Sequence, residues 1–176
     1  MKIELFVLPS VMRRDFKEAF VLSKEDVLLT NPWLPERLEA MGMSLDEWYD
    51  VAYLWDKMSP EHPTVGLDHA LAILRGREGT VLFTSEDESP YKACSLTHRG
   101  REVFDFVAMA DPRELADLIE LEWRIYPRLR EQAPADPILP LDLYVFDTTL
   151  EWVIVFTHET VSVKGGTDRL CRVFGA

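Results

Sequence analysis

The amino-acid sequence predicts an α+β fold, with a helical N-terminal half and a mainly antiparallel sheet on which one long helix packs. Helical patterns dominate residues 10–76, and short apolar runs typical of strands dominate residues 79–176. The strand-like runs are mostly joined by hairpin-length connections. A regular alternation of strands and helices, which a parallel sheet requires, is missing from the sequence.

The length of 176 residues fits one domain that spans residues 1–176. A chain of this size buries roughly 70% of the surface that its unfolded form exposes, so it can build a core without disulfides or metals. The composition, 47% hydrophobic and 28% charged, is that of an ordinary globular protein.

The first part of the chain is expected to contain one strand and several short helices. Residues 3–8 form an apolar run that predicts a strand, and residues 10–43 are less regular. Within them, residues 23–30 predict a short helix stopped by an Asn-Pro pair. Residues 35–41 predict another helical turn or two, closed by a glycine.

A clearer helix begins at Ser44. Ser44 and Glu47 have the spacing of a capping box, in which each side chain satisfies a free backbone N–H at the helix start. Aromatic residues at helical spacing extend this prediction over residues 44–58. The next helix is expected to begin near Asp68 and to end at Gly76.

The second part of the chain predicts a sheet and one long helix. The helix covers residues 112–131, with Asp111 as its N-cap and a proline at its first position. Both faces of the run 151–157 are apolar, which predicts a central strand covered on both sides. The predicted strands are 81–84, 91–96, 103–109, 141–146, 151–157 and 169–174.

The formal net charge is −12, from 31 acidic and 19 basic residues. Such a surface repels the phosphates of nucleic acids and of acidic membranes, so neither is expected as a ligand. It attracts a basic protein, although acidic surfaces also simply keep proteins in solution. The apolar N-terminal run is too short for a signal peptide, and no run reaches membrane-spanning length, so we expect a cytoplasmic protein.

The cysteines and histidines give no pattern typical of a metal or cofactor site. Cys94 and Cys171 lie in apolar strand-like runs and are expected to be buried free thiols, with a disulfide as the alternative. A reactive couple of Cys94 with His98 would need positive charge that this sequence hardly supplies. The four histidines, none spaced as helix-borne metal ligands, are His62, His69, His98 and His158.

A glycine-rich tetrapeptide, Lys164-Gly165-Gly166-Thr167, is superficially similar to a phosphate-binding loop. The full spacing of that motif and the helix that should follow it are both missing. A two-glycine hairpin turn explains the tetrapeptide.

Three carboxylates and two tyrosines are candidates for contact with a partner. The loop residues Glu86, Asp87 and Glu88 are expected to be exposed, where they could contact Lys or Arg side chains of a partner or bind a cation. Tyr49 and Tyr53 lie beside the main apolar stripe of the helix 44–58, so they are better placed for surface contact than the tryptophans.

His158 and Glu159, at the end of the predicted central strand, are the most suggestive catalytic residues. The His158 ring could act as a general base with Glu159 or Asp147 nearby. The alternative is a histidine that ties down a neighbouring loop by a hydrogen bond.

The stretch 142–159 resembles the terminal hairpin of small bacterial domains of unknown function. Their pattern, Phe-Asp followed by Trp and then Thr-His-Glu, corresponds here to Phe146-Asp147, Trp152 and Thr157-His158-Glu159. Some of these domains are grouped with immunity proteins, which neutralise toxins by binding them. The resemblance implies binding and brings no catalytic role with it.

Two functions are therefore expected from different classes. The first is a non-enzymatic cytosolic protein, of the immunity or regulatory kind, whose acidic surface covers a basic protein such as a toxin. The alternative is a small hydrolase that uses His158, Glu159 and Asp147. A homodimer formed through the aromatic helix 44–58 is a further possibility.

Overall fold

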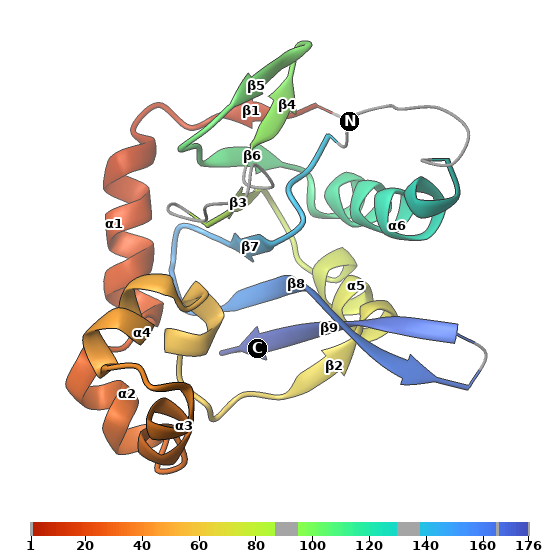
Figure 1. Cartoon of the computed structure of the whole chain (residues 1–176). Coiled ribbons are helices and arrows are strands. Elements are labelled where there is room, and N and C mark those ends of the chain that lie inside the picture. Colours follow the sequence, from red (N-terminus) through yellow and green to blue (C-terminus); the bar gives the residue numbers. More distant parts are fainter. Residues whose placement is uncertain (1, 87–94, 130–137, 165, 176) are drawn as a thin grey trace.

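The computed structural model describes residues 2–86, 95–129, 138–164 and 166–175, except for the side chains of 125–129. It confirms the predicted α+β class (Figure 1). The strands are β1 (Glu4–Leu5), β2 (Thr64–Gly66), β3 (Val81–Thr84), β4 (Leu96–His98), β5 (Arg101–Val103), β6 (Ala108–Ala110), β7 (Leu143–Phe146), β8 (Val153–Val163) and β9 (Gly166–Phe174). The helices are α1 (Pro9–Phe20), α2 (Lys24–Thr30), α3 (Leu34–Met41), α4 (Leu45–Val51), the 3₁₀ helix η1 (Leu54–Lys57), α5 (Leu67–Arg75) and α6 (Pro112–Leu129).

Seven of the described strands form one antiparallel sheet in the order β1-β6-β3-β7-β8-β9-β2. Strands β4 and β5 form a separate hairpin. The N-terminal strand β1 and the strand β2 lie at the two edges, so the helical part of the sequence also contributes to the sheet. The last three strands in the chain, β7, β8 and β9, are neighbours in the sheet as hairpin connections require.

Helices cover both faces of the sheet (Figure 1). On one face, α5 and α6 bury apolar side chains such as Leu71 and Ile119 against the strands. On the other face, α1 and η1 do the same with Phe16 and Trp55. Strand β8 contributes to both cores, which confirms the prediction of a central strand. Helices α2, α3 and α4 form a small core of their own beside α1.

Local capping signals place several helix ends where the sequence predicts them. The Ser23 hydroxyl accepts a hydrogen bond from Asp26 N at the start of α2, and Ser44 and Glu47 form the predicted capping box of α4. Helix α3 ends at Gly42, whose φ of 65° is left-handed and suits glycine. The carboxylate of Asp111 caps α6 by accepting from Glu114 N at 3.1 Å.

Two predictions for the helical part are wrong. Helix α1 occupies residues treated as irregular, because its first residue follows Leu8, which has no capping side chain. The predicted helix 44–58 ends at Val51, and Ala52 and Tyr53 are extended before η1 begins. The aromatic surface proposed for a homodimer is therefore absent, since Trp48 and Trp55 are 9% and 2% exposed and lie in two separate cores.

The predicted strand 103–109 is also divided. Phe104–Val107 separates β5 from β6, and Asp105 has a φ of 54°, a left-handed conformation that interrupts a strand. The first part of the predicted strand 91–96, including Cys94, lies outside the described residues. Cys171 is a buried free thiol, and burial raises its pKa to about 12.

Among the helices that the structure describes, none combines the length and the apolar character needed to cross a bilayer.

Candidate functional site

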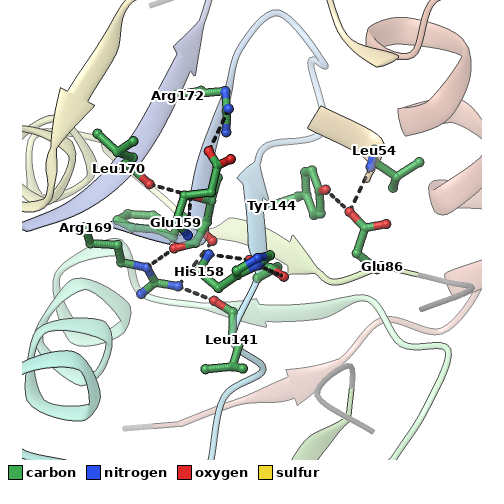
Figure 2. A network of polar contacts seen from close by, with 12 residues as sticks. Leu54, Glu86, Leu141, Tyr144, His158, Glu159, Arg169, Leu170 and Arg172 are labelled. Atoms are coloured by element: carbon green, nitrogen blue, oxygen red, sulfur yellow. Dashed lines mark hydrogen bonds and ion pairs between the residues drawn. The ribbon is translucent and has the colours of Figure 1, made fainter. Parts of the chain in front are cut away.

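His158 of β8, labelled in Figure 2, forms a close pair with Asp142, which directly precedes β7. The backbone N–H of His158 donates to one Asp142 oxygen at 2.6 Å, and Nδ1 of the ring lies 2.9 Å from the other oxygen. The Asp142 side chain is 12% exposed. Burial raises the pKa of this carboxyl, and the contacts with His158 offset part of that rise. Two contacts to one buried carboxylate fix the orientation of the imidazole.

Two aromatic rings enclose one side of the imidazole. Trp55 of η1 meets His158 edge-on at 5.5 Å between centroids, and Tyr53 does so at 4.9 Å. The two rings stack on each other at 4.3 Å. The His158 side chain remains 37% exposed, and no described residue forms a hydrogen bond with its Nε2 atom. The pair therefore presents one ring nitrogen outward while the other is held.

Glu159 points to a different partner. Its carboxylate accepts a hydrogen bond from Arg172 of β9 at 2.8 Å. The Arg172 guanidinium lies over the Trp55 ring, 5.6 Å from its centroid. Within the described part of the chain, Nη1 of Arg172 and Nε1 of Trp55 are buried without a hydrogen-bond acceptor. We call Tyr53, Trp55, Asp142, His158, Glu159 and Arg172 the His158 cluster.

Arg169 links the backbone segments that carry Asp142 and His158. Its guanidinium is buried and donates to the carbonyl oxygens of Thr157 at 2.5 Å, Phe156 at 3.2 Å and Leu141. Loss of solvation lowers the pKa of this guanidinium. The carbonyls of Thr157 and Phe156 belong to β8, and that of Leu141 to the segment before β7. The Arg169 side chain therefore links the two sides of the β7–β8 hairpin (Figure 2). The acceptors of these three hydrogen bonds are all backbone carbonyls, which indicates a structural role for Arg169.

The prediction that Glu86 is an exposed loop residue is wrong. Glu86 is 9% exposed, and its carboxylate accepts from Leu54 N at 2.9 Å and from the Tyr144 hydroxyl (Figure 2). Burial raises its pKa, and these two donors offset part of the rise. Glu86 thus connects η1 to the sheet. Asp87 and Glu88 lie outside the described residues.

The structure does not bring Asp147 to His158. Asp147 follows β7 at the far end of the hairpin, where its carboxylate accepts from Thr149 N at 2.9 Å and from Trp152 Nε1 at 2.7 Å. Its neighbour Phe146 pairs with Val153, which is five residues before His158. At the rise of a strand this separation is about 16 Å. Asp147 therefore shapes a turn and takes no part in the His158 cluster.

Asp142 is the residue that the sequence prediction missed. It precedes β7, and the observed register pairs Leu143 with Phe156, so Asp142 lies beside Thr157 and His158. The feature that would have identified Asp142 as the partner of His158 is the register of the β7–β8 hairpin. The predicted strands 141–146 and 151–157 leave a connection of four residues, 147–150, whereas the observed connection between β7 and β8 runs from residue 147 to 152, which shifts every pair.

A second candidate site is the surface of α2, α3 and α4, residues 24–51, which we call the helical lobe. It contains seven carboxylates and two cations, giving a net charge of −5 within 28 residues. All seven carboxylate residues are exposed. Of these seven, Asp46 is the one that the described structure places in an ion pair, 2.6 Å from Lys24. The seven residues are Glu25, Asp26, Glu36, Glu39, Asp46, Glu47 and Asp50.

The helical lobe also exposes large apolar side chains. Leu29 is 80% exposed, Val51 71% and Trp33 50%. Tyr49, predicted to contact a partner, is instead half-buried: its hydroxyl donates to Leu22 O at 2.7 Å, and Lys57 lies over its ring. Exposed aromatic and aliphatic side chains surrounded by charge are typical of a surface that binds a protein.

A shallow depression of about 340 Å³ on α1 has a mixed lining. Its Arg13 side chain is buried against Asp105 and also donates to Ser85 O, while Arg14 lies 2.8 Å from Asp15. The two arginines are thus already paired with carboxylates of the chain. The lining residues are Ser10, Arg13, Arg14, Lys17, Glu18 and Asp105.

Within the described residues, no three His, Cys, Asp or Glu side chains converge in a way that could hold a metal ion. Comparisons of this chain with protein families, with curated proteins and with solved structures find no match.

Proposed function

We propose that this protein is a non-enzymatic binding protein, and that its helical lobe binds a positively charged protein partner. The observation that carries the proposal is the charge of the lobe, −5 over 28 residues with all seven carboxylates exposed. Coulomb attraction between such a surface and Lys or Arg side chains accelerates and orients association.

The exposed apolar side chains of the helical lobe can contribute binding affinity that charge alone does not provide. Charge at the rim of an interface mainly sets association rate and specificity, while buried aromatic and aliphatic side chains contribute most of the affinity. Trp33, 50% exposed, is the side chain best suited to be such an anchor. An immunity or regulatory protein that neutralises a basic toxin has these requirements, and the hairpin 142–159 resembles that of small bacterial domains of unknown function, some of which are grouped with immunity proteins.

The experiment is affinity capture at low ionic strength with three baits. One bait is the wild type, and the second carries Glu36→Lys, Glu39→Lys and Asp50→Lys in the lobe. The third carries the same change elsewhere, at Glu61, Glu78 and Glu151, which are also exposed. Each triple variant raises the net charge from −12 to −6, so the two variants differ in the position of the charges and not in their sum.

We expect a basic protein, identified by mass spectrometry, to be held by the wild type and by the third bait and to be lost from the lobe variant. Its release should follow added salt, because exposed charges are screened. Equal capture by all three baits, or capture of no basic protein, would contradict the proposal.

A second function is favoured by one observation, the Asp142–His158 pair. A carboxylate that holds Nδ1 while Nε2 stays outward is the arrangement of a general base that removes a proton from water or a hydroxyl group. In this alternative the hydrolase uses Asp142 in place of Asp147 to orient His158. Glu159 takes no part in the proton transfer, because its carboxylate is hydrogen-bonded to Arg172.

The alternative is tested by hydrolysis of a panel of p-nitrophenyl esters by the wild type and by His158→Gln. Under the alternative, the variant keeps its fold by circular dichroism and loses the rate by about 100-fold or more, as expected when a general base is removed. Equal rates for the two proteins exclude catalysis by His158 on these esters.

A further inference from the structure

The exposed face of α3 carries a tryptophan and an arginine side by side. Leu34 and Leu38 form the opposite face, which is buried in the small core of the helical lobe. Trp33 immediately precedes α3 and is 50% exposed, and Arg37 is exposed as well. The backbone N–H of Arg37 donates to the Trp33 carbonyl oxygen at 3.3 Å, which places the two residues one helical turn apart.

The guanidinium of Arg37 lies over the ring of Trp33, 5.7 Å from its centroid. Carboxylates flank this arginine in the sequence, with Glu36 before it and Glu39 two residues after it. In the described part of the chain, Arg37 nevertheless forms no ion pair with these or other carboxylates, whereas Lys24, the other cation of the lobe, has one. The ring face of Trp33 is therefore a surface on which a guanidinium rests in this protein.

The other aromatic rings of the helical lobe are less available. Trp48 is 9% exposed. Tyr49 is half-buried and already has two cations over its ring, Nζ of Lys57 at 4.8 Å and Nζ of Lys24 at 5.4 Å. Trp33 is thus the ring of the lobe that a cation from another molecule can reach most easily.

The chemistry of the ring selects one kind of cation. The negative charge of the lobe attracts Lys and Arg side chains alike. A guanidinium is planar and less strongly hydrated than an ammonium, so it loses less hydration when it stacks on an aromatic ring. The residue that lies on Trp33 in this structure is an arginine, in agreement with this preference.

We propose that the Trp33 ring binds an arginine side chain of the basic partner, and that Arg37 occupies this place in the free protein. The inference rests on the function proposed for the helical lobe, and it names the side chain of the partner that the lobe recognises. Because Arg37 is exposed and held by no ion pair among the described residues, a partner can displace it at little cost. Arg37 therefore competes with the partner, whereas the carboxylates of the lobe attract the partner.

Nuclear magnetic resonance tests the proposal on the isotope-labelled full chain, with the peptides heptaarginine and heptalysine as probes of equal charge. The indole N–H signal of Trp33, assigned as the one lost in Trp33→Phe, should shift as heptaarginine is added. Heptalysine should shift this signal less at the same concentration, since its ammonium groups stack weakly on an aromatic ring. A signal that stays in place, or that responds equally to both peptides, would overturn the proposal.

Two variants of equal charge test the competition by Arg37. Arg37→Gln and Lys24→Gln each remove one of the two cations of the lobe, so Coulomb attraction of the peptide increases by a similar amount. Only Arg37→Gln vacates the Trp33 ring. Its dissociation constant for heptaarginine, read at the Trp33 signal, should therefore be about 2–5-fold lower than that of Lys24→Gln. Equal constants for the two variants would refute the role of Arg37.

The two triple charge variants separate the arginine site from the attraction by the lobe. The lobe variant and its matched control, changed at Glu61, Glu78 and Glu151, are titrated with heptaarginine as well. Weaker binding by the lobe variant alone, together with no preference for arginine at Trp33, would remove the arginine site and leave the attraction by the lobe intact. Equal binding by both triple variants would contradict the attraction by the lobe itself.

Discussion

Replacement of Glu86 by alanine should destabilise the fold strongly, although the sequence alone suggested an exposed loop residue. The variant removes the acceptor of two buried donors, Leu54 N and the Tyr144 hydroxyl, whose residues are 8% and 0% exposed. A hydrogen bond to a charged group contributes about 1.5–3 kcal/mol, so two such bonds give about 3–6 kcal/mol. Because burial of the carboxylate opposes this gain, we expect a loss near the lower limit, about 3 kcal/mol.

The assay is urea unfolding at pH 7, followed by circular dichroism, for the wild type, Glu86→Ala, Tyr144→Phe and the double variant. The sum of the two single losses of unfolding free energy should exceed the loss in the double variant. The reason is that Tyr144→Phe removes a hydroxyl that Glu86→Ala leaves without a partner. A loss below about 1 kcal/mol for Glu86→Ala would mean that the carboxylate is solvated, and the reasoning would fail.

Glu86→Gln extends this test to pH. Burial raises the pKa of the Glu86 carboxyl in the folded protein. This carboxyl therefore keeps its proton at a pH where the same group in the unfolded chain, with a pKa of about 4.3, has lost it. This contribution to stability is complete below the unfolded pKa and is lost as pH rises through the folded pKa. The stability of Glu86→Gln relative to the wild type should therefore increase with pH over that window, and a constant difference would contradict the assignment.

Three further variants or reactions test other parts of the structure. Arg169→Met should lower stability by about 3–5 kcal/mol in urea unfolding, because two buried carbonyls and one partly buried carbonyl lose a charged donor; a loss below about 1 kcal/mol would refute the structural role. Asp147→Ala should cost about 1–2 kcal/mol, since it leaves the Trp152 indole without its acceptor, and should not alter partner binding. The thiol of Cys171, with a pKa of about 12 and no exposure, should resist alkylation at pH 8 in the native protein and react after unfolding; rapid native labelling at this residue would contradict its burial.

The parts of the fold that sequence predicts well are those fixed by local chemistry. The capping box of Ser44 and Glu47, the N-cap Asp111 and the left-handed Gly42 each satisfy backbone groups within a few residues, so their effect is visible in the sequence. The apolar faces of β8 are visible for a similar reason, since a strand buried on both sides has no polar alternation.

The parts that were missed depend on contacts between distant residues. The helix from Ser44 stops early, and Leu54 N donates to Glu86, 32 residues away. Helix α1 lacks a capping side chain and is held by packing of Phe16 against Tyr144 and Phe146. The partner of His158 depends on the length of the β7–β8 connection, which hydrophobic patterns do not determine.

The measurement that addresses the central claim most directly is the dissociation constant of the captured basic protein as a function of salt, for the wild type and the lobe triple variant. Attraction by the helical lobe predicts that the wild-type affinity falls steeply as salt rises, and that the variant binds weakly with little salt dependence. An affinity that is the same at low and high salt, or the same in both proteins, would show that the carboxylates of residues 24–51 do not bind the partner.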